Sequence, residues 1–262
     1  MPSITAATPA QSRQAFGSAR AQASIGLCLF VLVFGGWLAL HLWAMFAFTI
    51  TARNWLLVLP IFTLQCWLSV GLFIMAHDAM HGSLAPGLAR VNAAIGAFLL
   101  FIYAGFGWQK LRDAHFDHHR HAGTAADPDF NAGNPQHFWP WYQLFLRRYF
   151  DWRSMAYVCT VVLVYLIIFN VSIENIVLLY GLPALASSLQ LFYFGTYRPH
   201  RHESEAFADH HRARTNRYGA LVSLISCFHF GYHHEHHLSP SVPWWGLPRQ
   251  HALWLKAQSG SQ

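Results

Sequence analysis

The chain has 262 residues, of which 54% are hydrophobic and only 11% carry a formal charge, and its mean hydropathy is +0.26. This composition lies outside the range of ordinary soluble domains and favours an integral membrane protein over a soluble core of four buried helices. The net charge of +6 fits a surface beside anionic lipids, and we expect no nucleic-acid partner.

The first twenty residues contain Arg13 and Arg20, and an uncharged apolar segment follows them. That segment is too long to be the core of a cleavable signal peptide. We therefore expect residues 1–20 to form a disordered tail and residues 21–262 to form a single membrane-embedded domain.

Four apolar segments are long enough to cross a bilayer, which takes about 20 residues. Between residues 21 and 76 the only formally charged residue is Arg53, and between residues 155 and 197 it is Glu174. Each of these charges marks a turn, so the segments form two hairpins. We predict an all-α integral membrane protein with four transmembrane helices, at about 21–48, 55–76, 155–171 and 175–197.

Residues 91–108 are also uncharged and are nearly long enough to span the membrane. We expect an interfacial or re-entrant helix here, beginning after the Pro86-Gly87 break. A fifth span would place the histidines that follow on the opposite side of the membrane from the other histidines.

Basic residues are concentrated between Lys110 and Arg153 and between Arg198 and Arg217, whereas the hairpin turns hold almost none. By the positive-inside rule, both termini and both polar stretches face the cytoplasm. The histidine-rich segments are therefore expected to form a cytoplasmic cap on the membrane helices.

Histidines are abundant, eighteen in all, and most of them lie in polar stretches beside the apolar ones. Three groups have regular spacing: box one is H-x-x-x-H, and boxes two and three are both H-x-x-H-H. On a helix, residues at i, i+3 and i+4 lie on one side, so each box presents its imidazoles together. The boxes are His77 and His81; His115, His118 and His119; and His233, His236 and His237.

Imidazole is the commonest metal ligand and suits zinc, copper, iron and nickel. A catalytic zinc site takes only about three protein ligands, so eight imidazoles are too many for one ion and suit two. Box one can hold one metal ion or contribute one ligand to each of a pair. Two hairpins bring boxes one and three to the same face, and box two joins them if residues 91–108 do not cross.

The three boxes, spread over two hairpins, resemble those of the membrane fatty-acid-desaturase-like di-iron oxygenases. More narrowly, HDAMHGSL at 77–84, HAGTAADPDF at 121–130 and FHFGYHHEHHLSPSVPWWGLP at 228–248 resemble bacterial β-carotene ketolases. These motifs run from about residue 77 to 248. The first 75 residues match only in hydrophobic character.

The resemblance implies β-carotene 4-ketolase activity in a bacterial inner membrane, with C4 and C4′ of β-ionone rings oxidised to ketones by two successive hydroxylations. The implied products are echinenone and canthaxanthin, or astaxanthin from hydroxylated rings such as those of zeaxanthin. Two non-haem irons and dioxygen are implied, with reduced ferredoxin as electron donor. No G-x-G-x-x-G, P-loop or C-x-x-C-H motif occurs in the sequence, so a partner is expected to supply the electrons.

The family pattern, carried over residue by residue, assigns the box histidines to iron as catalytic ligands, and His200 in the TYRPHR stretch is the expected ninth ligand. Pro199 favours a first helical turn, which holds His200 beside the membrane and turns His202 toward a different face. The nine assigned ligands are His77, His81, His115, His118, His119, His200, His233, His236 and His237.

A second set of residues is expected to lie around the ligands, where it could support ligating imidazoles. It consists of Asp78, Asp117, His121, Asp129, His202, His229, His234 and Glu235. The aromatic stretch at 139–152 and the pair Trp244-Trp245 are expected to mark the lipid headgroup layer rather than a substrate pocket.

Two alternatives remain open at this point. A carotenoid hydroxylase or an acyl-lipid desaturase would use the same machinery with a different product. A membrane metal-binding or transport protein would line a path with polar residues inside the membrane, but the predicted spans hold almost no histidine, with His41 the exception.

Overall fold

The computed structural model describes residues 18–216 and 218–259. This part of the chain consists of helices and connecting loops without a strand, as predicted. Most of the predicted tail, and Arg217, lie outside the described residues. The last residues of that tail are helical, because the Ser18 side chain accepts a hydrogen bond from the Ala21 amide at 3.2 Å and so begins α2 at Ala19.

The first hairpin consists of α2 (Ala19–Phe46) and α3 (Val58–His81), and the short helix η1 (Trp55–Leu57) leads into α3. These bounds agree with the spans predicted at 21–48 and 55–76, except that α3 continues to His81. It ends at Gly82, whose φ of +71° a residue without a Cβ adopts easily. Box one therefore occupies the last turns of a membrane helix.

The second hairpin consists of the helix Trp152–Ile168 and the long helix Ile173–His200. The first contains α7 (Trp152–Leu163) and η2 (Val164–Ile168). The second contains α8 (Ile173–Asn175), η3 (Ile176–Gly181), α9 (Leu182–Phe192), η4 (Tyr193–Tyr197) and α10 (Arg198–His200).

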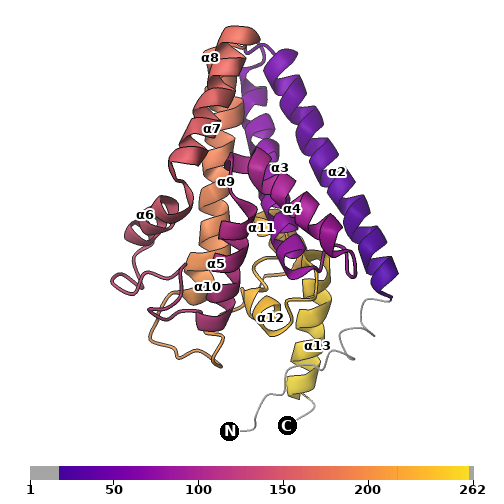
Figure 1. Ribbon diagram of the computed structural model, residues 1–262, viewed down its shortest axis with the longest axis vertical. Coiled ribbons are helices and arrows are strands. Elements are labelled where there is room, and N and C mark those ends of the chain that lie inside the picture. The colour runs from indigo at the N-terminus through magenta and orange to yellow at the C-terminus, as the bar shows by residue number, and fades with distance from the viewer. Residues whose placement is uncertain (1–17, 217, 260–262) are drawn as a thin grey trace.

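Both hairpin turns lie at the same end of the molecule (Figure 1). Asn175 connects them, since its side-chain amide donates to the carbonyl groups of Ala44 at 2.7 Å and Phe48 at 2.5 Å. A buried amide that is fully hydrogen-bonded stabilises a helix contact without burying an unpaired polar group. The two hairpins therefore return the chain to a common opposite end.

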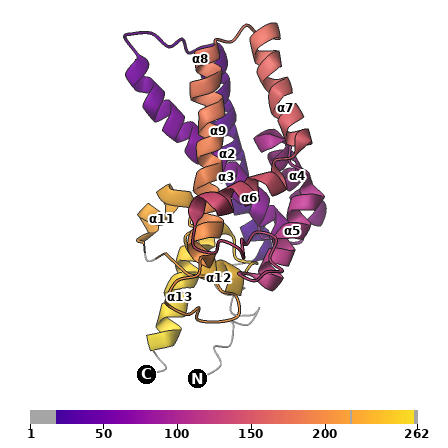
Figure 2. The ribbon, with the colours of Figure 1, turned by 90° about the vertical axis from the view of Figure 1, so that its left-hand side faces the viewer.

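Two bent helix pairs complete the membrane part. α4 (Ala89–Ala104) packs on α3 and turns by 102° into α5 (Trp108–His121), and α6 (Phe138–Tyr149) is bent by 83° from Trp152–Ile168. Figure 2 shows α6 lying across the bundle.

Among the described residues, three helices are by themselves long and apolar enough to span a membrane, and there are up to five spans if each bent pair counts as one. The three are Ala19–Phe46, Trp55–His81 and Ile173–His200. The span predicted at 155–171 reaches this length only together with α6. Large apolar side chains on the outer surface, such as Leu59 (70% exposed) and Ile167 (74% exposed), are suited to lipid contact.

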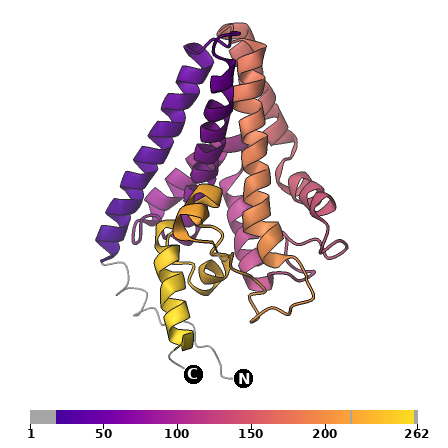
Figure 3. The same cartoon turned by 180° about the vertical axis from the view of Figure 1, so that it is seen from behind.

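The C-terminal elements are α11 (Ala220–Cys227), α12 (His233–Leu238), η5 (Trp244–Gly246) and α13 (Leu247–Ser259). They lie at the end of the bundle away from the hairpin turns (Figure 3). Phe228 and His229 have φ values of +46° and +62°, so the chain reverses sharply between α11 and α12.

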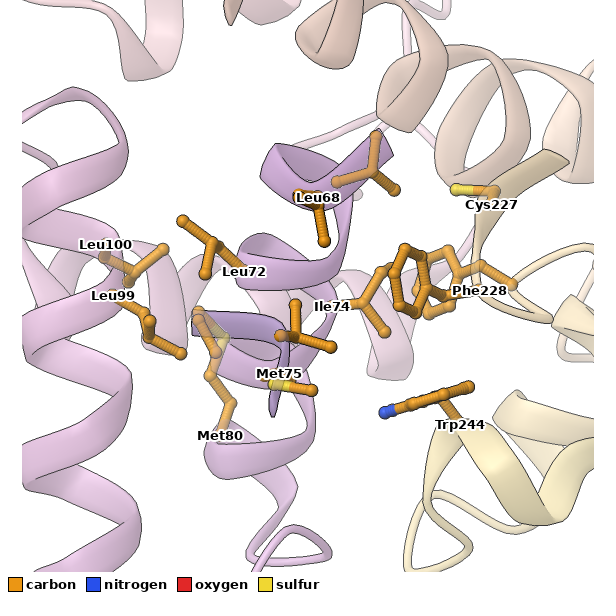
Figure 4. Packing of buried hydrophobic residues seen from close by; sticks show 14 of the residues in the cluster. Leu68, Leu72, Ile74, Met75, Met80, Leu99, Leu100, Cys227, Phe228 and Trp244 are labelled. Atoms are coloured by element: carbon orange, nitrogen blue, oxygen red, sulfur yellow. The ribbon is translucent and has the colours of Figure 1, made fainter. Parts of the chain in front are cut away.

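The main hydrophobic core surrounds α3 (Figure 4). Leu99 and Leu100 of α4 pack on one side of this helix, and Phe228 and Trp244 pack on the other. Gly71 allows the close approach of Phe228, because a Cβ at this position would lie 2.6 Å from the Phe228 ring. The C-terminal segment is thereby fixed against the helix that carries box one.

Candidate metal centre

The nine histidines assigned as ligands from sequence lie together at the end of the bundle away from the hairpin turns, in two clusters. In each cluster the ring nitrogens that could bind a metal all lie within 4.8 Å of one another. The first cluster contains His77, His81, His115, His119 and His236, and the second contains His118, His200, His233 and His237.

Boxes two and three each divide between the clusters. On α5, His115 and His119 are one turn apart and belong to the first cluster, whereas His118 belongs to the second. On α12, His236 belongs to the first cluster and His233 and His237 to the second. The expectation that each box directs all its imidazoles to one point is therefore correct only for box one, which lies wholly in the first cluster.

The imidazoles are in direct contact within and between the clusters. In the first cluster, Nε2 of His81 lies 2.7 Å from Nε2 of His115, and Nε2 of His119 lies 3.0 Å from Nε2 of His236. The ring centroids of His119 and His237 are only 4.2 Å apart, which places the two clusters side by side. Boxes one, two and three therefore lie together at one end of the helix bundle.

The donor set fits metal ions. Burial lowers the pKa of His233, His236 and His237 well below its ordinary value, because an imidazolium ion loses its hydration in the interior. A neutral imidazole retains a lone pair that can bind a metal. Within the described chain, Nε2 of His200 and both ring nitrogens of His77 are buried without a hydrogen-bond partner.

Unpaired buried nitrogens are costly, and a bound ion would remove that cost. Nine imidazole nitrogens in two adjacent groups therefore fit two transition-metal ions.

Two of the imidazoles are oriented through their other ring nitrogen. Nδ1 of His118 lies 3.0 Å from both carboxylate oxygens of Asp127, and Nδ1 of His200 donates to the carbonyl oxygen of Arg212 at 2.7 Å. Such partners fix the tautomer and leave Nε2 free for a metal. Asp127 and the Arg212 carbonyl were both missed from sequence, where Asp129 was expected instead.

The sequence does contain a signal for Asp127. An aspartate in a turn accepts a hydrogen bond from the amide two residues on, and Asp127 accepts from the Asp129 amide at 2.8 Å and from the Gly123 amide at 2.9 Å. In the D-P-D sequence, the first aspartate is therefore the one that anchors the loop and faces His118.

Of the second set of expected residues, Asp78 lies next to a predicted ligand. Its Oδ1 lies 3.6 Å from Nδ1 of His77, and its other carboxylate oxygen accepts the Trp244 amide at 3.0 Å. Asp129 accepts a hydrogen bond from the Tyr149 hydroxyl instead.

The other six residues of this second set have different environments. His121 is exposed at the end of α5. The contacts of the remaining five are Asp117 with Arg120, His202 with the Gly123 carbonyl, His229 with the Trp244 ring, His234 with Asp209, and Glu235 with His251 and Thr215. The support of ligating imidazoles predicted for these residues is not found in their contacts.

An apolar cavity adjoins both clusters. Its wall includes His77 and His115 of the first cluster and His118 and His233 of the second. Most of the remaining wall is aromatic or aliphatic: Phe73, Met80, Tyr103, Phe106, Leu111, Phe145, Leu146, Phe150, Leu191 and Phe230. A cavity of this kind suits an apolar ligand whose reacting atom faces the imidazole clusters.

The cavity corrects part of the interpretation of the aromatic stretch at 139–152. Phe145, Tyr149 and Phe150 line the cavity and do not mark the headgroup layer. Trp139 and Trp152, which are 63% and 73% exposed, have the exposure expected of headgroup residues. Trp244 is buried in the main core.

Comparison with known proteins gives a consistent result. Residues 53–171 and 145–262 match the family model described as fatty acid desaturase. The chain is 49% identical over 217 residues to a "Beta-carotene ketolase" of Paracoccus sp., which covers 82% of this chain and 88% of the relative. A "Beta-carotene ketolase" of a second Paracoccus strain is also 49% identical to the chain, over 214 residues. A "Beta-carotene 4-ketolase" of Protosiphon botryoides is 36% identical over 73% of this chain and 50% of the relative.

Proposed function

Because this chain belongs to the β-carotene ketolases of the fatty acid desaturase family, we propose that its two histidine clusters each hold an iron ion and that the adjoining cavity holds a β-ionone ring. The protein is a membrane oxidoreductase with ketolase activity. One observation carries the assignment of the site: imidazoles of both clusters form part of the wall of one apolar cavity.

The proposed reaction oxidises C4 and C4′ of β-carotene. Each hydroxylation places one atom of dioxygen on carbon, and the other leaves as water with two protons and two electrons from an external donor of the ferredoxin type. A second hydroxylation at the same carbon gives a gem-diol, which loses water to form the ketone. One modified ring gives echinenone, two give canthaxanthin, and the hydroxylated rings of zeaxanthin give astaxanthin.

Iron ions held in the clusters would supply the redox chemistry that activates dioxygen. The chain supplies position and environment. The carboxylate of Asp127 and the carbonyl of Arg212 hold the rings of His118 and His200 in place. The aromatic wall excludes water and orients a substrate that has no polar group to bind.

A carotene-accumulating bacterium that expresses the chain is expected to form echinenone and canthaxanthin. Conjugated ketones shift the visible spectrum to the red, whereas hydroxylation barely moves it, so pigment identification separates a ketolase from a hydroxylase or a desaturase. The control is the same host with the His119→Ala variant at equal membrane expression. Only hydroxylated or unchanged carotenoid in cells with membrane-inserted, metal-bound protein would contradict the assignment.

We also propose that the histidine end faces the cytoplasm of a bacterial inner membrane and that α4 and α5 form a re-entrant element. Lys110 and Arg112 on α5, and Arg201 and Arg214 after α10, belong to the same end as the clusters. The α2–α3 turn contributes only Arg53. This distribution follows the positive-inside rule.

Cysteine labelling from either side of the membrane tests this orientation. Labels placed near Gly123 and near Ser204 are both expected to react only from the cytoplasmic side, and a label beside Arg53 only from the periplasmic side. The exposed native residues Cys28 and Cys159 are first replaced by serine. A label near Gly123 that reacts only from the periplasm, with one near Ser204 reacting from the cytoplasm, would show that the α4–α5 segment crosses the membrane.

A further inference from the structure

The apolar cavity contains one carboxyl group. Asp129 lies on the cavity wall together with Tyr149 of α6, whose hydroxyl donates a hydrogen bond to Oδ1 of Asp129. The backbone of Asp129 is also fixed, because its amide donates to Asp127 at 2.8 Å and its carbonyl accepts from Nε1 of Trp141 at 2.6 Å. The carboxyl group is therefore held in a defined place.

This carboxyl group can form further hydrogen bonds. A carboxylate offers about four lone-pair positions, and Tyr149 occupies one of them. Oδ2 of Asp129 has no hydrogen-bond partner among the residues that the structure describes. Burial raises the pKa of Asp129, but an alcohol both donates and accepts, so it can pair with this group in either protonation state.

The pair lies at the metal end of the cavity. The Asp129 amide donates to Asp127, whose carboxylate contacts His118, and both Asp129 and His118 line the cavity. Ser188, another cavity hydroxyl, precedes His200 by twelve residues on the long helix, which corresponds to roughly 18 Å. Thr196 also lines the cavity near His200, but its single hydroxyl offers fewer hydrogen-bonding positions than the Asp129 carboxyl and the Tyr149 hydroxyl together.

We propose, on the basis of the ketolase reaction above, that the Asp129–Tyr149 pair binds the C4 hydroxyl of the alcohol formed in the first hydroxylation and holds that ring for the second. A hydroxyl group enclosed only by apolar side chains would be buried without a partner, which favours release of the alcohol. β-Carotene has no oxygen atom, so the pair contributes no hydrogen bond to the first substrate. Its role is confined to the second oxidation.

The test is a double variant, Asp129→Leu with Tyr149→Phe. Replacing both partners of a buried hydrogen bond by apolar groups of similar shape avoids leaving either one unpaired. Membranes that contain the variant are supplied separately with β-carotene and with its 4-hydroxylated derivative, and the initial rates of oxidation are compared. The ratio of the β-carotene rate to the alcohol rate is expected to rise roughly tenfold, and the alcohol is expected to accumulate in carotene-producing cells.

The matched control is Tyr142→Phe, which removes a phenol hydroxyl from the same helix. Tyr142 is buried like Tyr149, but its hydroxyl lies 3.1 Å from Ser188, so the control is expected to keep the wild-type rate ratio. A purely structural role for the pair predicts an equal loss with both substrates. An unchanged rate ratio in the double variant would therefore overturn the proposal, whatever the total activity.

If the double variant does not accumulate in membranes, the single variant Tyr149→Phe is tested in its place. It removes the hydroxyl group that donates to Asp129 and is expected to raise the rate ratio several-fold. An unchanged ratio overturns the proposal in that case. If wild-type protein forms neither alcohol nor ketone, the proposed function itself fails. That result is distinct from an unchanged ratio in an active enzyme.

Discussion

His200→Ala is expected to abolish ketone formation and to lower the amount of bound iron. The side chain is fully buried, its Nδ1 is engaged by the Arg212 carbonyl, and its Nε2 has no partner among the described residues. Its ring centroid lies 4.7 Å from that of His118 and 4.9 Å from that of His233. Replacing a residue that only supports a metal ligand lowers metal affinity or activity by roughly 10-fold to 100-fold. We therefore expect replacement of a ligand to lower ketone formation by more than about 100-fold.

The control for this prediction is His202→Ala, two positions along the chain. His202 contacts the Gly123 carbonyl through Nε2 at 3.2 Å and packs on the ring of Phe130. This variant is expected to retain measurable ketone formation and its iron. Paired pigment and iron analysis at equal membrane expression checks both expectations. A normal ketone yield from His200→Ala, or a loss confined to His202→Ala, would reverse the assignment.

The helical hairpins could be predicted because their cause is local. A run of apolar residues interrupted only by Arg53, or only by Glu174, has few ways to cross a bilayer other than as two helices joined at that charge. The bend between α6 and α7 could not be predicted in this way. α6 packs on α9 through contacts such as that between Tyr142 and Ser188, which are distant from each other in the sequence.

The histidine positions could be predicted from spacing, but their division into two clusters could not. Periodicity places His115, His118 and His119 on one side of α5 and does not say which neighbours they meet. That is decided by packing, which brings His236 of α12 to His119 and brings His200 to His118. A nonlocal arrangement of this kind requires the tertiary structure.

The residues around the ligands were predicted least well, because side-chain direction in loops and short helices has no simple period. Glu235 precedes His236 on α12 but points toward His251, at 2.6 Å, and is buried there. Consecutive helical residues face directions about 100° apart, so proximity in sequence to a ligand was a poor guide. Asp127 supports His118 only because the loop at 122–130 folds back onto α5.

We propose that the two clusters are two separate metal sites. Five nitrogens gather in the first and four in the second, and α5 contributes to both. One ion could not take nine imidazoles, because transition-metal sites in proteins seldom exceed six ligands and a catalytic site keeps positions open. Each cluster also contains buried nitrogens without a partner, in His77 and in His200.

Metal analysis of active protein purified under anaerobic conditions tests whether each cluster holds its own ion. Iron is measured per chain together with dioxygen-dependent ketone formation by the same sample, and the His200→Ala variant serves as the control. The predicted result is two iron ions per wild-type chain and a reduced iron content in the variant. A value near one iron per fully active chain, or full activity with zinc alone, would contradict a di-iron centre built from the two histidine clusters.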